Sequence, residues 1–142
     1  MKMQFMRITS RLCRGAFALA IASCLAPGDQ TLIAREAKVT LVYVGAKNCA
    51  PCEAWQRTDG AAFRDTPQFS RLQYREIKSP SLYDVLKDEN WPEDLSGYRQ
   101  SIDKQAGVPL WLVVADGRLV LQGFGLSQWR EAVLPKLTQL LQ

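Results

Sequence analysis

The chemistry of this chain is most clearly indicated by two cysteines in the segment Cys49-Ala50-Pro51-Cys52. The sequence contains no histidine. Ser-His-Asp and Cys-His hydrolysis, histidine-ligated zinc and haem held by a proximal histidine are therefore excluded. The chemistry left to the two thiols is disulfide exchange, metal binding or the formation of a structural disulfide.

The spacing of this motif favours disulfide exchange. Pro51 suits the first turn of a helix, where the missing N–H of proline costs no hydrogen bond. Cys49 is then expected at the helix N-terminus, where unpaired main-chain N–H groups and the helix dipole favour a thiolate over a thiol. Cys52 follows one turn later and can attack a mixed disulfide formed on the first sulfur. We predict a reachable nucleophile at Cys49 and a resolving thiol at Cys52, with Ala50 and Pro51 as the spacer.

Two structural roles compete with this interpretation. A disulfide that closes so short a loop constrains little of the unfolded chain, so it is a weak staple. A four-cysteine zinc site needs ligands near the pair, and the two other cysteines, Cys13 and Cys24, lie far upstream. Redox work is therefore favoured over both, and we expect neither a metal nor a cofactor.

Apolar and β-branched runs predict the strands that position the motif. Residues 39–44 end just before the cysteines and are typical of a buried strand. The strongest later run, residues 108–115, is followed by Asp116-Gly117 and a further apolar run, which predicts an antiparallel hairpin. Residues 72–77 alternate apolar and polar side chains, so we expect a strand there that runs parallel to the first.

Helices are predicted at the cysteine motif, in the middle of the chain and at its C-terminal end. Apolar side chains recur three and four positions apart within residues 91–106, and a shorter helical stretch is expected over residues 81–87. Ser127 is expected to cap a final amphipathic helix. Pro135 falls inside that last pattern, so the helix should kink there or restart.

A strand followed by Cys-x-Pro-Cys at a helix start, with Val108-Pro109 opening a later strand, resembles the thioredoxin superfamily. The resemblance covers residues 38–142 and is strongest to small exported bacterial members. It implies an α/β fold with a mixed four-stranded central sheet flanked by helices, here with a helical insertion before the strand of Pro109. It also implies a cis bond between Val108 and Pro109 beside the dithiol, and a main chain at Val108 that pairs with an extended substrate.

Two positions depart from the family's pattern. Asn48 stands where thioredoxins usually carry a tryptophan. Tyr43 occupies the place of a buried aspartate that assists proton transfer from the resolving thiol. The sequence therefore leaves open the route by which Cys52 loses its proton.

Residues 1–26 have the layout of a signal peptide. Basic residues precede an apolar run that is shorter than the about 20 residues needed to span a bilayer. Ordinary cleavage after a small residue competes with cleavage before Cys24, because the segment Ile-Ala-Ser-Cys that ends there resembles a bacterial lipobox. Residues 27–37 then form a linker and residues 38–142 the domain. We expect a periplasmic or otherwise exported protein, with a membrane-anchoring lipid on Cys24 in the second case.

The formal charge of +4 does not indicate a polyanion partner. Four of the 18 basic residues but one of the 14 acidic residues lie in residues 1–34, so the rest is almost neutral and no nucleic acid is expected. We expect a monomer that exchanges disulfides with exported proteins or peptides and with a thiol–disulfide electron donor or acceptor. The reductase direction is preferred, because no dimerisation domain is added to the single core. The alternative is a non-catalytic thioredoxin-fold module that holds a partner at the cis-proline groove.

Overall fold

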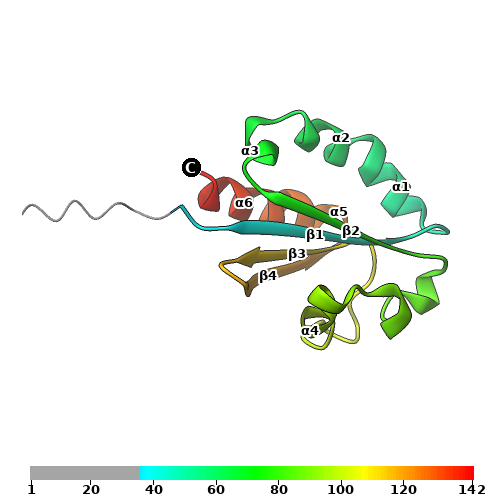
Figure 1. Ribbon diagram of the computed structural model, residues 1–142. Helices are drawn as coiled ribbons and strands as arrows, with labels where there is room; N and C mark the ends of the chain where they lie inside the picture. Colours follow the sequence, from blue (N-terminus) through cyan, green and yellow to red (C-terminus); the bar gives the residue numbers. More distant parts are fainter. Residues whose placement is uncertain (1–35) are drawn as a thin grey trace, which may run out of the picture. The chain divides into compact units, whose positions relative to one another are not determined.

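The computed structural model describes residues 36–142, which form a four-stranded sheet flanked by helices (Figure 1). The strands are β1 (Val39–Ala46), β2 (Gln73–Ser79), β3 (Leu110–Ala115) and β4 (Arg118–Phe124). Their order in the sheet is β2-β1-β3-β4. β1 is parallel to β2 and antiparallel to β3, and β3 is antiparallel to β4. The mixed four-stranded sheet predicted from the sequence is confirmed.

The helices divide between the two faces of this sheet (Figure 1). On one face lie α1 (Ala50–Arg57), α2 (Asp59–Arg64), α3 (Pro67–Ser70), α5 (Gly125–Gln128), the π-helical turn η4 (Trp129–Val133) and α6 (Leu134–Leu140). The other face carries the insertion between β2 and β3. Its elements are the 3-10 turns η1 (Leu82–Asp84), η2 (Asp88–Asn90) and η3 (Glu93–Leu95), followed by α4 (Ser96–Arg99).

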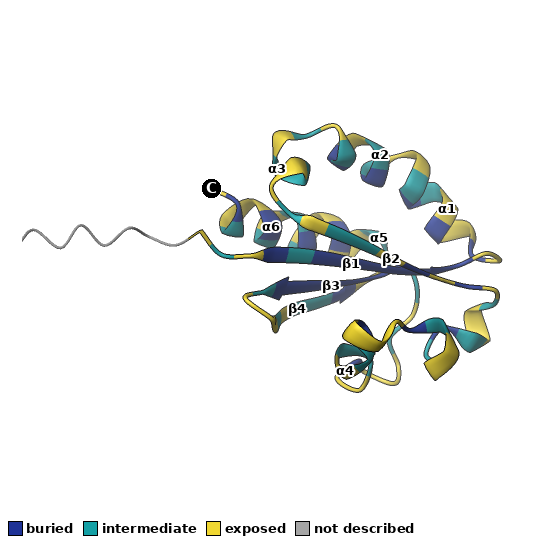
Figure 2. Cartoon of the chain, viewed as in Figure 1, coloured by how far each residue is buried: buried dark blue, intermediate teal, exposed yellow. Residues whose placement is uncertain are grey.

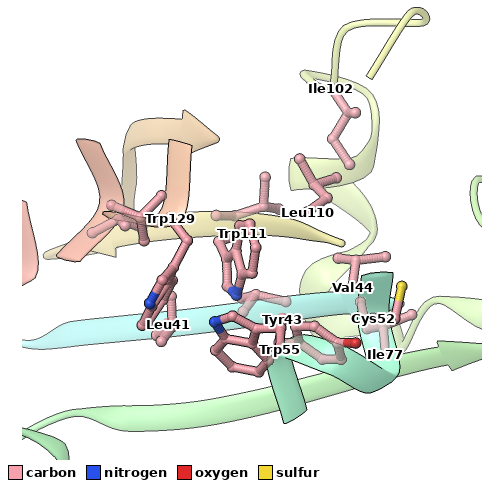
Figure 3. Close-up of a cluster of buried hydrophobic side chains, with 14 of the residues drawn as sticks. Leu41, Tyr43, Val44, Cys52, Trp55, Ile77, Ile102, Leu110, Trp111 and Trp129 are labelled. Atoms are coloured by element: carbon pink, nitrogen blue, oxygen red, sulfur yellow. The ribbon is translucent and has the colours of Figure 1, made fainter. Parts of the chain in front are cut away.

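β1 and β3 are the buried centre of the molecule, dark blue along nearly their whole length in Figure 2. Side chains alternate between the two faces of a strand. Tyr43 of β1 therefore faces α1, where its ring stacks on Trp55 with 4.8 Å between the centroids. Val44 and Leu110 face the insertion and lie toward Ile102 (Figure 3). The helices on one face of the sheet and the insertion on the other therefore both pack against β1 and β3.

The long helix expected over residues 91–106 is wrong. Only Ser96–Arg99 is α-helical there, after the 3-10 turn Glu93–Leu95. The physical reason is local: a proline at position 92 has no N–H to donate, and Gly97 costs about 1 kcal/mol relative to alanine inside a helix. The helix expected over residues 81–87 is likewise reduced to the 3-10 turn Leu82–Asp84. The apolar spacing marked buried side chains correctly, since Leu95 and Ile102 are buried, but not a continuous helix.

The C-terminal helix differs from the sequence-based prediction at its start and agrees with it at Pro135. Ser127 lies inside α5 and does not cap it. The side chain of Gln128 reaches back instead, and its Oε1 accepts the N–H of Phe124 at 2.9 Å. The chain then passes through the π-helical turn, and α6 begins at Leu134 with Pro135 in its first turn. A restart at this proline, one of the two outcomes predicted, is confirmed.

The predicted hairpin between β3 and β4 is confirmed. Its two turn residues have positive φ, 49° at Asp116 and 77° at Gly117, as the favoured two-residue hairpin turn requires. Asp116 also accepts the main-chain N–H of Lys38 at 3.0 Å through Oδ1. The turn is therefore tied to the residue just before β1.

Candidate functional site

Cys49 and Cys52 form a disulfide at the start of α1, with their Cα atoms 5.2 Å apart. Cys49 is the N-cap residue, in an extended conformation, and α1 begins at Ala50 with Pro51 in its first turn. The main-chain N–H of Cys52 points at the Cys49 sulfur over 3.1 Å. The sulfur of Cys49 thus lies at a helix N-terminus, where N–H groups and the helix dipole stabilise negative charge.

Val108 and Pro109 border this disulfide. The peptide bond between them is cis. The carbonyl oxygen of Val108 lies 3.9 Å from the Cys49 sulfur. The carbonyl of Pro109, which is buried, accepts the N–H of Gly125 at 2.9 Å and so fixes this loop to the start of α5. The structure brings together all the residues that the sequence singled out; their roles in catalysis and substrate binding stay predictions.

Both cysteines are nearly closed off from solvent in the disulfide form, which differs from the reachable sulfur we expected. Cys49 is 2% exposed and Cys52 is 3% exposed. The insertion begins next to this helix start, since Oδ1 of Asn48 accepts the N–H of Leu82 at 2.9 Å. This bond holds η1 against the residue that precedes Cys49.

A cavity of about 360 Å³ lies on the Cys52 side of the disulfide. Its lining includes Tyr43, Lys47, Cys52, Glu53, Gln56 and Lys78. Burial is the main cause that raises the pKa of the Tyr43 phenol above its ordinary value, so this hydroxyl is protonated at neutral pH and cannot take up a proton. Gln56 donates to Glu76 at 2.6 Å, and Glu76 pairs with Lys78 at 3.2 Å. The acid–base groups on this side are therefore partly exposed carboxylates and two lysines, not a buried aspartate.

An aromatic cluster fixes α1, and with it the disulfide, on the sheet (Figure 3). The Trp55 ring contacts Trp111 at 5.3 Å and Trp129 at 5.0 Å between centroids, besides its stack on Tyr43. All three tryptophans are at most 1% exposed. Aromatic pairs of this kind contribute about 0.5–1.5 kcal/mol each beyond the area that they bury. The tryptophans are core residues of the structure.

The sequence analysis missed the contribution of the insertion to the site. Leu82 and Tyr83 stand beside the disulfide helix, and Tyr83 is 93% exposed. An adjacent pair of large apolar residues between polar ones was the available signal. The helix predicted over residues 81–87 includes this pair without assigning its side chains to the site.

The described residues were also compared with the requirements of a metal site and of a membrane-spanning helix. Residues 36–142 contain no group of three or more cysteine, aspartate or glutamate side chains placed to hold a metal ion. Within the same residues no helix combines the length and the apolar character needed to cross a bilayer. The predicted signal peptide and the cysteine at position 24 lie outside the described residues.

Fold and site together define a thioredoxin-fold protein with a disulfide inside a Cys-x-x-Cys motif. The thioredoxin of Malassezia sympodialis is similar in structure: the TM-score is 0.50 at 17% identity, over 74% of this chain and 79% of that one. A thioredoxin variant from Halobacterium salinarum gives a TM-score of 0.48 at 20% identity, over 74% of this chain and 76% of that one. Thioredoxin f from spinach chloroplasts gives a TM-score of 0.48 at 12% identity, over 73% of this chain and 77% of that one. Neither a protein-family model nor a curated protein matches the chain.

Proposed function

We propose that the protein is a thiol–disulfide oxidoreductase that reduces disulfides of protein or peptide substrates through Cys49 and Cys52. The observation that carries this proposal is the disulfide at the N-terminus of α1, directly against the cis Val108–Pro109 segment. A helix N-terminus stabilises the thiolate that must attack or leave in disulfide exchange. The second sulfur, three residues on, is already within bonding distance of the first.

The reaction consists of two balanced exchanges. In the reduced protein, the Cys49 thiolate attacks one sulfur of a substrate disulfide, forms a mixed disulfide and releases the other substrate sulfur as a thiolate. Cys52 then loses its proton and attacks the Cys49 sulfur, which restores the disulfide seen here and releases the second substrate thiolate. Two electrons pass from the dithiol to the substrate. A dithiol of a redox partner reverses the change in the protein.

Insulin reduction driven by dithiothreitol tests this function. The full chain should accelerate the precipitation of insulin chains, Cys49→Ser should fall to the background rate, and Cys52→Ser should accumulate a mixed disulfide with the substrate. Cys24→Ser is the matched control, because it removes a cysteine outside the motif, and it should retain the rate. Wild-type protein at the background rate would falsify the proposal.

The burial of both cysteines, at 2% and 3% exposure, favours a second candidate. A thioredoxin fold can hold a partner at the cis-proline segment without turnover. The insulin assay separates the two: equal rates for wild type and Cys49→Ser, together with partner binding that survives the substitution, identify the binding module.

The direction and the compartment belong to the same proposal. Reduction potentials of related dithiols span about −270 to −120 mV. Whether the protein donates electrons to its substrates or accepts them depends on how its own potential compares with the potential of its compartment. We expect a potential at the reducing end, measured by equilibrium with glutathione. We also expect the protein to be an exported monomer with a processed N-terminus. Mass spectrometry of the mature chain identifies that N-terminus and reveals whether a lipid is attached at Cys24.

A further inference from the structure

A second cavity, of about 320 Å³, opens on the other side of the disulfide. It lies between the insertion and the segment that leads to Pro109, and we name it the insertion pocket. One wall comes from the start of the insertion and the other from the segment before the proline, with the lining residues Leu82, Tyr83, Leu86, Lys104, Ala106 and Val108. Most of its lining side chains are apolar, while main-chain and hydroxyl groups also face it, and one lining side chain, Lys104, is charged.

The insertion pocket adjoins the sulfur that reacts first. Val108 belongs to one wall, and its carbonyl oxygen is 3.9 Å from the Cys49 sulfur. Leu82 belongs to the opposite wall and donates its N–H to Asn48, the residue before Cys49. A polypeptide joined to Cys49 through its own cysteine can therefore place a neighbouring side chain in the pocket.

Large apolar side chains are exposed around this pocket. Tyr83 is 93% exposed and Leu82 is 42% exposed. Phe124, at 41%, continues the patch: a Cβ added at Gly107 of the pocket wall would lie 3.8 Å from its ring. Apolar side chains that gather beside a cavity, in contrast to scattered ones, mark a binding surface.

The charge at the rim distinguishes among apolar partners. Lys104 is exposed and makes no ion pair within residues 36–142. The nearby cations of the insertion, Lys87 and Arg99, are paired with Asp84 and Asp88. Lys104 is thus free to meet a carboxylate of a partner, and electrostatic complementarity of this kind sets specificity more than raw affinity.

The size of the pocket limits the shape of its occupant. An α-helix with its side chains is about 10 Å across, too wide for this volume, whereas one large apolar side chain fits. We infer that the insertion pocket is a specificity site that binds an extended substrate segment through a large apolar side chain near the substrate cysteine, with an acidic residue beyond it that meets Lys104. This inference rests on the proposed function and names the kind of substrate that it acts on.

Three peptides test the inference, each with a single cysteine that is joined to glutathione in a mixed disulfide. Each is mixed with the full-length protein, whose Cys49–Cys52 disulfide has been reduced beforehand. In the first peptide the cysteine has phenylalanine two residues away and glutamate three residues away on both sides. The second has alanine for phenylalanine, and the third has lysine for glutamate. The protein dithiol is oxidised to its disulfide while the peptide thiol and glutathione are released, so the second-order rate constant of this single turnover follows from the free peptide, separated by chromatography after acid quenching. We expect about a tenfold loss for the alanine peptide and about a fivefold loss for the lysine peptide, because a desolvated apolar contact and an exposed ion pair are worth roughly those factors.

Two variants with matched controls locate the effect. Lys104→Glu should reverse the preference, so that the lysine peptide becomes the better substrate, while Arg118→Glu makes the same charge change on β4 and should keep the wild-type order. Leu82→Asp should abolish the preference for phenylalanine. Val120→Asp is its control, because Val120 is equally exposed at 42% and lies on β4, away from the insertion.

The outcomes separate this inference from the proposed function. Equal rates for the three peptides, alongside normal reduction of oxidised glutathione, overturn the pocket and leave the oxidoreductase standing. If no disulfide is reduced above background, the proposed function fails. Titration with the same peptides carrying serine for cysteine then tests the pocket, which is overturned if they bind equally. A dimer in sedimentation that Leu82→Asp dissociates would also overturn it, since a second copy would then be the occupant.

Discussion

Single hydroxyl groups in this core have opposite effects on stability, depending on whether they have a partner. The Tyr74 hydroxyl is buried and makes no hydrogen bond within the described residues. The Tyr98 hydroxyl donates to the carbonyl of Gly117 at 2.9 Å. A buried polar group without a partner loses its hydration and gains nothing in return. Substitution by phenylalanine should therefore change the free energy of unfolding differently at the two sites.

Tyr74→Phe should leave the free energy of unfolding near neutral pH unchanged or raise it by up to about 1 kcal/mol. Burial raises the pKa of the Tyr74 phenol above its ordinary value of 10.0. The wild type therefore loses stability as the pH rises above that value, because the tyrosine ionises first in the unfolded chain. The advantage of Tyr74→Phe should grow between about pH 7 and about pH 11 in urea titrations.

Tyr98→Phe is the control for this measurement. It should cost about 0.5–1 kcal/mol near neutral pH, because it leaves the Gly117 carbonyl without its side-chain donor. Equal effects of the two substitutions would show that the Tyr74 hydroxyl has a partner after all.

At the scale of elements, we expect the bond between Asn48 and the start of the insertion to limit the access of a reacting thiol to the disulfide. Asn48→Ala removes the acceptor for the Leu82 N–H, and a net hydrogen bond is worth about 1 kcal/mol, or about a fivefold change in an equilibrium constant. We expect the variant's disulfide to be reduced by dithiothreitol up to about fivefold faster than the wild type's. Stopped-flow measurement of the thiols gives the rate.

Asn90→Ala is the matched control, because Asn90 also holds main chain of the insertion, by donating to the carbonyl of Asp84 at 2.6 Å, but has no bond to the cysteine helix. An acceleration in both variants would mean that general loosening of the insertion is responsible. Unchanged rates in both would show that access is limited elsewhere.

Two glycines in short elements should respond to alanine in opposite directions. Gly97 lies inside α4 with nothing within 4 Å of an added Cβ, so Gly97→Ala should raise the free energy of unfolding by roughly 0.5–1 kcal/mol. Gly117 also has open space but a φ of +77°. Gly117→Ala should lower stability by about 1–2 kcal/mol, since the left-handed conformation disfavours a Cβ. Chemical denaturation of both variants measures the difference, and equal signs would contradict the turn geometry.

At the scale of the whole molecule, one ion pair ties the insertion to the sheet. The two terminal guanidinium nitrogens of Arg75 on β2 donate to the Asp94 carboxylate, at 2.6 and 3.2 Å. The hydrogen bonds from Arg75 lower the pKa of Asp94 below its ordinary value of 3.8. The stabilisation is therefore present above that value and is lost as the pH falls through the lowered pKa of the folded state.

Asp94→Asn tests this linkage. The urea midpoint of the variant should lie below that of the wild type at neutral pH, and the gap should close as the pH falls through the lowered pKa of Asp94 in the folded state, below which both chains lack the charge. At neutral pH, high salt should also reduce the difference between the two urea midpoints, because the side chains of Arg75 and Asp94 are partly exposed and salt screens their attraction. A gap that stays constant with pH would show that the carboxylate charge plays no part.

The sequence predicted the fold more completely than the site. The strands and the hairpin followed from β-branched runs and from Asp116-Gly117, and the resemblance implied a mixed four-stranded sheet flanked by helices, without the order of its strands. The insertion did not follow, because apolar spacing at Leu95 and Ile102 marks burial without fixing the hydrogen-bond pattern of the chain. Cys49 is buried, and the residue before it is hydrogen-bonded to Leu82, which is far away in sequence, so no local pattern could reveal these surroundings of the motif.

The irregular pairing of β3 with β4 has a consequence for how the molecule behaves in a crowded solution. Val113 pairs with Leu121 and Val114 with Leu119, so Val120 is an extra, unpaired residue on the outermost strand. Such a bulge twists a border strand out of line and interrupts the row of free amides and carbonyls that another polypeptide would need to align with. On the opposite border, β2 carries the charges of Arg75, Glu76 and Lys78. Both borders of the sheet therefore carry features that disfavour the addition of a further strand, a bulge on β4 and charged side chains on β2.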